Sequence, residues 1–206
     1  MLKKIERAQQ LLKKEAAVFR CPTCHEPMHV EGVGLICQQR HQFDLSKKGT
    51  LYFLNHGVQT EYNKKMFTSR GKMIQSGMYA PVLNKIMHYL PQNKTVVDVG
   101  CGEGSFLAEL SQAGLSGLKI GFDLSKEGIY LASNQPIDAF WCVADLTNLP
   151  FADQGLDTIL NIFSPSHYQE FRRVLKADGT VIKIIPEENY LKELRAAFYP
   201  NDEKKQ

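Results

Sequence analysis

Four residues near the start of the chain have the types and the spacing of a metal site. Cys21 and Cys24 form a C-x2-C pair, and Cys37 and His41 form a second pair after twelve intervening residues. Two tight turns can bring three thiolates and one imidazole onto a single ion, which is the ligand number of tetrahedral zinc. Four protein ligands leave no coordination position for water, so the spacing predicts a structural zinc ion rather than a catalytic one.

Two alternatives exist for this cluster. Cys21, Cys24 and His25 also match the C-x-x-C-H pattern of covalent haem attachment, but that interpretation leaves the second pair without a role. His25 and His29 are alternative fourth ligands, although His41 completes the symmetric pairing better. We therefore expect zinc bound by the three cysteines and His41.

A second group of residues could hold a nucleotide-like ligand. Gly100, Gly102 and Gly104 form G-x-G-x-G directly after an apolar run that contains Asp98. Glycines between a strand and a helix let a ligand approach the backbone at the helix N-terminus. The spacing differs from the G-x-G-x-x-G fingerprint of dinucleotide binding, because Ser105 follows the third glycine directly.

Acidic residues follow the next two predicted strands. Asp123 ends the second strand and can accept hydrogen bonds from ribose hydroxyls, as acids at this position do. Asp145 ends the third strand, where its carboxylate could meet an adenine amino group. Because ligands of parallel sheets bind at the carboxyl ends of strands, these residues predict one cofactor site.

The elements that must position these residues alternate between strands and helices. Short apolar runs rich in β-branched residues predict strands at 94–100, 118–123, 137–145, 156–163 and 180–186. Intervening segments predict helices, including 166–179 and a final helix at 187–199. Alternation of this kind indicates an α/β fold with a doubly wound, mainly parallel, Rossmann-like sheet, preceded by a small N-terminal zinc-binding module.

Composition and charge restrict the class of protein further. The 206 residues are 43% hydrophobic and 23% charged, which excludes a disordered chain, and no apolar run is long enough to span a membrane. Residues 1–90 carry 14 basic and 6 acidic side chains, whereas residues 91–206 carry 11 and 16. A balance of +8 in the first half and -5 in the second suggests a polyanion-binding part. We expect a cytoplasmic protein with no membrane partner.

The ordered string of motifs resembles one family. The C-x2-C-x12-C-x3-H motif is followed by HQFDLSKKG, then MFTSRGKMIQSGMYAP, then DVGCGEG, and later by VADLTNLPFADQGLDTI. Together these motifs resemble the bacterial 23S rRNA (guanine-N1) methyltransferases, which are zinc-containing class I S-adenosylmethionine-dependent enzymes and include a branch that confers macrolide resistance. We expect four segments: a helical leader at 1–19, which is an addition to the family's pattern, then a zinc-binding module at 20–55, a connector with helices at 56–93, and a methyltransferase domain at 94–206. Members of the family usually continue into two further strands, so we expect that domain to be truncated at its C-terminus.

The resemblance also implies roles for individual residues. It implies that Tyr79, Gly102 and Glu103 contact S-adenosylmethionine, and that Leu146 frames the adenine together with Asp145. The family's further contact, usually a histidine after the fifth strand, falls on Tyr190.

The expected substrate is a guanine in a hairpin loop of 23S ribosomal RNA. Basic side chains of the front half could follow an RNA backbone, and the candidates are Lys47, Lys48, Lys64, Lys65, Arg70 and Lys72. A homodimer is a further hypothesis about partners. Two alternative functions are a methyltransferase for small molecules and a zinc-bearing RNA-binding protein that binds the cofactor without catalysis.

The proposed reaction is in-line attack of guanine N1 on the methyl carbon of the sulfonium, with loss of the N1 proton to a base or to water. The segment after the fourth strand lacks the Asp/Asn-Pro-Pro-aromatic sequence of exocyclic-amine methyltransferases, which agrees with a ring-nitrogen target. Candidates for contacts with the base are Asn161, Ser164 and His167, and no general base is identified.

Overall fold

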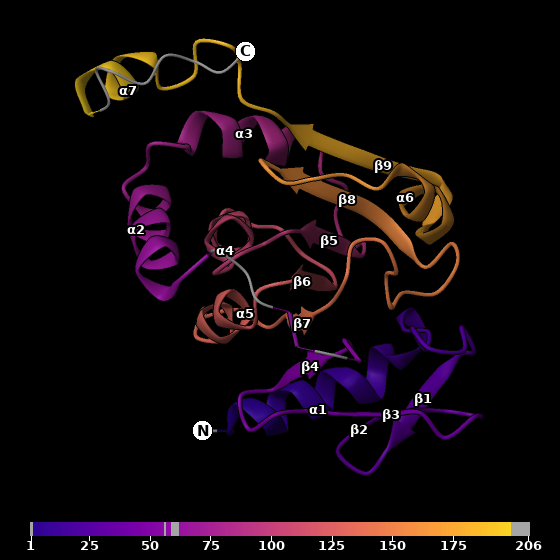
Figure 1. Cartoon of the computed structure of the whole chain (residues 1–206). Coiled ribbons are helices and arrows are strands. Elements are labelled where there is room, and N and C mark those ends of the chain that lie inside the picture. Colours follow the sequence, from indigo (N-terminus) through magenta and orange to yellow (C-terminus); the bar gives the residue numbers. More distant parts are fainter. Residues whose placement is uncertain (1, 56, 59–61, 199–206) are drawn as a thin grey trace.

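The computed structural model describes residues 2–55, 57–58 and 62–198. A six-stranded sheet forms its centre, with strand order β4-β7-β6-β5-β8-β9 and parallel pairing throughout (Figure 1). In spatial order the strands are β4 (Thr50–Tyr52), β7 (Phe140–Val143), β6 (Lys119–Asp123), β5 (Val96–Val99), β8 (Leu156–Ile162) and β9 (Leu175–Ile184). The predicted doubly wound α/β fold is confirmed.

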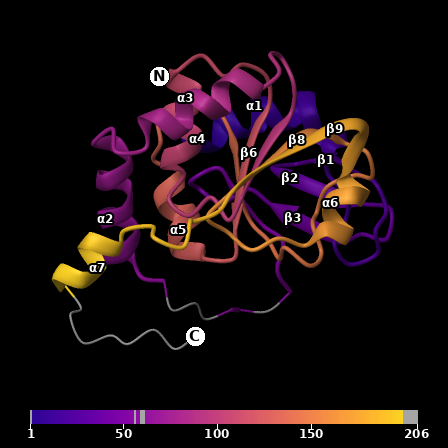
Figure 2. The same ribbon diagram turned by 90° about the horizontal axis from the view of Figure 1, so that it is seen from above.

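Helices cover the two faces of this sheet. The helices that follow the N-terminal region are α2 (Lys64–Gln75), α3 (Ala80–Tyr89), α4 (Ser105–Gln112), α5 (Lys126–Ala132), α6 (Tyr168–Val174) and α7 (Lys192–Phe198). Helices α2 to α5 lie on one side of the sheet and α6 on the other (Figures 1 and 2). None of the helices within the described residues is long and apolar enough to cross a membrane.

The N-terminal region supplies a second small sheet. It contains α1 (Lys4–Glu15), the 3-10 turn η1 (Ala16–Val18), and the antiparallel strands β1 (Met28–Glu31), β2 (Gly34–Cys37) and β3 (Gln42–Asp44). Strands β1 to β3 lie on the α6 side of the large sheet, as Figure 2 shows. This region therefore forms part of the layer that covers one face of the six-stranded sheet.

Alternating side chains of the central strands supply two cores. Val97 and Val99 of β5 face the core shared with α1, the small sheet and α6, whereas Val96 faces the core of α3, α4 and α5. In the first core, Phe19 packs against Phe140 with ring centroids 5.1 Å apart. Period-two alternation with both faces buried is typical of a strand at the centre of a doubly wound sheet.

Backbone hydrogen bonds join the N-terminal region to the loop between β7 and β8. The Arg20 amide donates to the Pro150 carbonyl, and the Ala152 amide donates to the Val18 carbonyl. The Arg20 guanidinium also lies 3.1 Å from Asp153. The segment that leads into the cysteine motif is therefore held directly against the β7–β8 loop, which begins at the carboxyl edge of the sheet.

Two features differ from the elements that the sequence predicts. Strand β4 lies within the predicted module at 20–55, yet it pairs with β7 of the large sheet; the boundaries of the four segments remain a prediction. The helix predicted at 166–179 is too long, because α6 ends at Val174 and β9 begins at Leu175, which pairs with Leu156 of β8.

Candidate functional site

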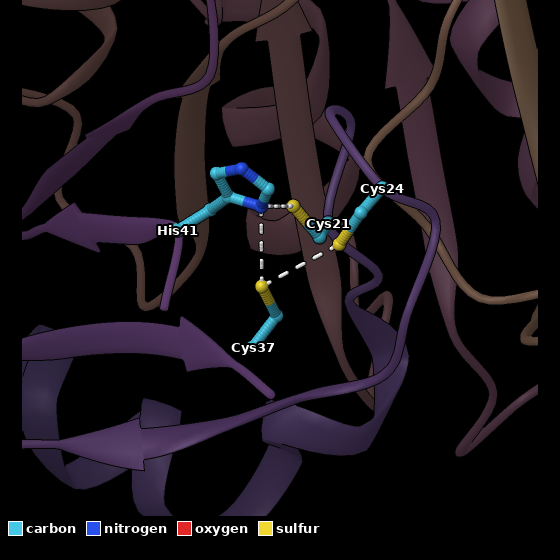
Figure 3. Close-up of side chains that lie close together, drawn as sticks. All are labelled: Cys21, Cys24, Cys37 and His41. Atoms are coloured by element: carbon cyan, nitrogen blue, oxygen red, sulfur yellow. Dashed lines mark hydrogen bonds between the residues drawn. The ribbon is translucent and has the colours of Figure 1, made fainter. Parts of the chain in front are cut away.

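Three cysteines and a histidine converge beside the small sheet. One donor atom from each of Cys21, Cys24, Cys37 and His41 lies within 4.8 Å of the others (Figure 3). The Cys37 Sγ lies 3.4 Å from Nδ1 of His41 and 3.5 Å from Sγ of Cys24. A tetrahedral zinc ion with bonds of about 2.3 Å to sulfur and about 2.0 Å to nitrogen needs donor separations of about 3.5–3.8 Å. The donor set therefore fits zinc.

Two short turns present these ligands. The His25 amide donates to the Cys21 carbonyl in the first turn, and the Arg40 amide donates to the Cys37 carbonyl in the second. Burial opposes ionisation of Cys37, but hydrogen bonds from the His41 backbone and from the neighbouring side chains lower the pKa of its thiol to about 7. The thiolate is the form that binds metal. His25 is exposed and lies outside the cluster, as does His29.

A cavity of about 460 Å³ lies where β5, β6, β7 and β8 end. The residues that line it are Tyr62, Met66, Phe67, Arg70, Val99, Gly100, Phe122, Asp123, Leu124, Ala144, Asp145, Leu146, Phe163, Ser164 and Pro165. Gly100, Asp123, Asp145 and Leu146, all predicted cofactor residues, are thus brought to one cavity. Asp145 lies two residues beyond the end of β7, rather than in the strand.

The glycine turn between β5 and α4 brings the backbone to this cavity. Gly102 has φ +57°, and a Cβ there would lie 2.6 Å from Nη1 of Arg70. Gly104 has φ +79° and is the N-cap of α4, and its added Cβ would lie 2.6 Å from the Trp141 ring. Both positions favour glycine because of their positive φ, and at Gly104 the buried Trp141 ring also leaves no space for a side chain.

Asp123 fixes the glycine turn against the end of β6. Its Oδ2 accepts from the Gly102 amide at 2.9 Å, and its Oδ1 accepts from the Ser125 amide at 2.7 Å. Burial raises the pKa of Asp123 above its ordinary value, and the hydrogen bonds from these backbone amides oppose the rise. The carboxylate still borders the cavity, and each of its oxygens has a second lone pair to offer a ligand.

Two buried carboxyl groups behind the turn lack hydrogen-bond partners. The Asp98 Oδ2 and both carboxyl oxygens of Glu103 are buried with no partner within the described part of the chain. Burial raises the pKa of Asp98 to about 7, and the charges of Glu103 and Asp123 contribute to the rise while Arg70 opposes it. Unpartnered buried carboxyl groups are costly, and they are expected where a ligand supplies the missing donors.

Arg70 is the cation among these acids. Its Nη1 lies 3.9 Å from Oε2 of Glu103, and its guanidinium lies 5.4 Å from the centroid of the Phe106 ring. The sequence predicts an RNA contact for Arg70, as for the neighbouring lysines. In the structure, its side chain is half-buried and lines the cavity. The spacing of Phe67, Arg70 and Ile74 could have indicated this position of Arg70. Residues three and four apart share one face of a helix, and Phe67 and Ile74 are buried.

A second cavity of about 460 Å³ shares Arg70 and Phe163 with the first. Tyr79 and Tyr190 line it, and their hydroxyls are hydrogen-bonded at 2.5 Å. Burial, followed by this hydrogen bond, raises the pKa of Tyr79, so the phenol stays protonated. The structure therefore brings the two tyrosines together beside the glycine turn.

Comparison with known proteins decides the family. Residues 96–179 match a family model described as "Methyltransferase domain", and residues 19–55 match a zinc-ribbon model described as "RlmA, N-terminal". The chain is 42% identical over 195 residues to the "Putative 23S rRNA (guanine-N(1)-)-methyltransferase YxjB" of Bacillus subtilis, covering 89% of this chain and 69% of the relative. The chain belongs to the 23S rRNA (guanine-N1) methyltransferase family.

More distant relatives agree with this family. The "23S rRNA (guanine(748)-N(1))-methyltransferase" of Streptomyces fradiae is 28% identical over 190 residues, covering 88% of this chain and 68% of that protein. Among solved structures, a "putative s-adenosyl-l-methionine-dependent methyltransferase" of Methanococcus maripaludis matches with TM-score 0.56 at 18% identity, over 70% of this chain and 76% of the other. The latter likeness shows the fold. The family, the fold and the cysteine-histidine cluster support both predicted cofactors, S-adenosylmethionine and structural zinc.

In this member of the rRNA methyltransferase family, the three predicted base-contacting residues have different surroundings. Asn161 is fully buried, and its amide donates to Oγ of Ser164 and to the Pro165 carbonyl. Ser164 lines the cavity and donates to the Val99 carbonyl. The His167 Nδ1 accepts from the Glu170 amide at 3.3 Å and caps α6.

The predicted RNA-contacting lysines of this methyltransferase lie at the surface. Lys64, Lys65 and Lys72 are exposed on α2, next to the cavity-lining part of that helix. Lys47 is exposed and Lys48 is half-buried in the turn before β4. The two groups come from different elements of the chain.

Proposed function

We propose that this protein transfers a methyl group from S-adenosylmethionine to N1 of a guanine in a hairpin loop of 23S rRNA. The observation that carries the proposal is the presence, in one chain, of a complete Cys3His cluster and a strand-end cavity rimmed by Gly100, Asp123 and Asp145. The 42% identity to a relative named for this reaction supports it. A purely RNA-binding role is disfavoured, because the acids and glycines of the cavity are intact.

The cavity residues suggest how the cofactor is held. In this proposal Asp123 accepts hydrogen bonds from the ribose hydroxyls, and Asp145 and Leu146 frame the adenine. The unpartnered carboxyl oxygens of Asp98 and Glu103 fit an ammonium group, and Arg70 fits a carboxylate. An amino-acid end such as that of methionine carries both charges, so these side chains would bind it in one orientation.

Residues of the second cavity complete this part of the proposal. Tyr79 and Tyr190 line the second cavity together with Arg70 and Phe163. Their rings would cover the methionine side of the cofactor and exclude water from it. Gly102 and Gly104 would then contact the cofactor through the backbone, and Glu103 through its carboxyl group.

S-adenosylmethionine supplies an electrophilic methyl group on a sulfonium. The chain's own residues have to align guanine N1 with that methyl group, and alignment supplies most of the rate enhancement in such transfers. A new N–C bond forms as the S–C bond breaks, and the N1 proton leaves to a base or to water. In this proposal Ser164 and Phe163, which line the cavity beside Pro165, would contact the target base.

The proposal includes how RNA reaches the site. Sequence-specific RNA-binding proteins mostly bind unpaired loop bases, which can leave the stack and enter a pocket. The exposed Lys64, Lys65 and Lys72 lie on α2, the helix whose Met66, Phe67 and Arg70 line the cavity, and could contact backbone phosphates. A cytoplasmic location and a homodimer also belong to this proposal.

Transfer of a labelled methyl group tests the proposal. Purified protein, labelled S-adenosylmethionine and either 23S or 16S rRNA transcripts should give label in the 23S transcript. Asp123→Ala should lower cofactor affinity by about 100-fold, since it removes a charged hydrogen-bond partner, while Asp178→Ala in an exposed part of β9 serves as the control. Transfer to small molecules alone would overturn the RNA substrate.

A further inference from the structure

Two tyrosine–lysine pairs lie on the outer side of β4 and α5. The Lys126 ammonium lies 5.8 Å from the centroid of the Tyr52 ring, and the Lys48 ammonium lies 5.1 Å from that of Tyr130. Tyr130 is 50% exposed and Tyr52 is 37% exposed. These four residues, called here the α5 face, combine flat aromatic surfaces with positive charge.

One end of the α5 face reaches the cofactor cavity. Lys126 begins α5, two residues after Leu124, which lines the cavity. Tyr52 ends β4 and is paired in register with Val143 of β7, two residues before the cavity residue Asp145. The Lys126 and Tyr52 pair therefore lies at the carboxyl edge of the sheet.

The other end reaches a separate basic cavity of about 280 Å³ between α1 and the segment after α5. Lys4, Arg7, Lys14 and Lys48 line it, and Asp138 is the acidic residue in its described lining. Asp138 lies 3.7 Å from Arg7. The four cations thus exceed the negative charge that faces them.

The cations in this cavity are close enough to influence one another. Burial lowers the pKa of Lys4, and the charges of Lys48 and Arg7 lower it further. The Lys4 ammonium also donates to the Ser133 carbonyl at 2.6 Å, which holds α1 against the end of α5. Lys48 belongs both to this cavity and to the α5 face, so the positive surface is continuous.

We propose that a single-stranded segment of the RNA substrate lies along the α5 face, with bases stacked on Tyr52 and Tyr130 and phosphates at Lys126, Lys48 and the α1 cavity. The inference rests on the proposed rRNA function and adds a binding surface on the methyltransferase sheet itself. Alternating aromatic and basic groups are the arrangement that binds single strands, because bases stack on rings while cations follow the backbone. The segment would lead directly to the cavity where the target base reacts.

The chain offers a matched control for this surface. Lys85 and Tyr89 on α3 form the same kind of pair, with the ammonium 5.5 Å from the ring centroid, and Tyr89 is 58% exposed. In Figure 1, α3 lies across the helical layer from β4 and α1. The variants Lys126→Ala/Tyr130→Ala and Lys85→Ala/Tyr89→Ala therefore remove the same groups from exposed helix positions at different places.

The test measures binding of a fluorescent 23S rRNA hairpin by anisotropy, with S-adenosylmethionine affinity measured by calorimetry and methyl transfer measured alongside. The α5 variant should bind RNA about tenfold more weakly than the wild type, with a salt dependence reduced by about 0.7 in log–log slope. Its affinity for the cofactor and its circular dichroism should not change, and the α3 variant should bind RNA as the wild type does.

The outcomes separate the two proposals. If the wild type binds and methylates the hairpin and both variants bind equally well, the α5 face is not an RNA surface, while the methyltransferase function stands. If both variants lose affinity equally, binding reflects overall charge, and the inference is likewise overturned. If the wild type neither binds nor methylates rRNA, the proposed function fails and this inference fails with it.

Discussion

Nη1 of Arg70 lies 3.9 Å from Oε2 of Glu103 and 2.6 Å from the position that a Cβ at Gly102 would take. This pair joins α2 to the loop between β5 and α4. The Glu103 carboxyl oxygens have no hydrogen-bond donor among the described residues. Arg70 therefore interacts with this carboxyl group through a long ion pair and not through a hydrogen bond. The arrangement leaves both groups able to bind a ligand that carries opposite charges.

Arg70 and Lys72 are basic residues of one helix with different expected roles. Arg70→Ala should weaken S-adenosylmethionine binding by about 10- to 100-fold, because a buried charged hydrogen bond contributes about 1.5–3 kcal/mol. Lys72→Ala removes an exposed charge of the same helix and should leave cofactor affinity unchanged. Calorimetry with the cofactor measures both variants. Equal cofactor affinity in Arg70→Ala and wild type would contradict the cofactor role of Arg70 and favour the earlier prediction that it contacts RNA.

Asp98 should make the stability of the cofactor-free protein depend on pH. Its pKa in the folded protein is about 7, above the value of about 4 for an exposed aspartate. Between these values the folded protein retains a proton that the unfolded chain releases, so the free energy of unfolding falls as pH rises, by up to about 1.4 kcal/mol per pH unit. Urea denaturation at pH 5 and pH 8 should show Asp98→Asn gaining stability relative to wild type at the higher pH. A difference that is the same at both pH values would contradict the raised pKa.

The zinc site gives a prediction with a matched histidine control. His41→Ala should lose about one zinc ion per chain and about 4 kcal/mol or more of stability, because loss of a structural metal is among the most destabilising changes. His29→Ala, an exposed residue of β1 outside the cluster, should keep its metal and its melting temperature. Elemental analysis and thermal denaturation measure the two effects. A metal-free wild type that folds normally would remove the zinc assignment.

His167, two residues after the cavity-lining Pro165, provides a test of whether a histidine near the site is catalytic. Since its Nδ1 caps α6, His167→Ala should cost about 1 kcal/mol of stability, and His167→Asn should restore most of it because asparagine is a good N-cap. The single-turnover rate of methyl transfer should stay the same in both variants. A loss of about 100-fold in rate at unchanged stability would instead identify His167 as an acid–base residue.

Local spacing made much of the site predictable from the sequence. The four metal ligands lie in pairs on two short turns. Their spacing along the chain was therefore enough to predict that they converge on one ion. Asp98, Gly100 and Asp123 could be placed at one edge because parallel strands bring their carboxyl ends together. The same argument placed Asp145 near them.

Long-range pairing accounts for what the sequence did not reveal. Strand β4 has three residues and becomes a strand only by pairing with β7, about 90 positions later in the chain. The end of α6 depends on the pairing of Leu175 with Leu156. The place of Arg70 depends on the close packing of α2 at Gly71, where a Cβ would lie 3.2 Å from Oγ of Ser105. Charge alone does not distinguish an arginine that faces RNA from one that faces buried acids.

In the proposed reaction, N1 of a guanine in 23S rRNA receives the methyl group. The most direct measurement is mass spectrometry of nucleosides from a 23S rRNA hairpin that was incubated with the protein and labelled S-adenosylmethionine. The expected product is labelled 1-methylguanosine at a single loop guanine, with no label when that guanine is replaced by adenine. Label in an exocyclic-amine product such as N2-methylguanosine, or no label in the RNA at all, would contradict it.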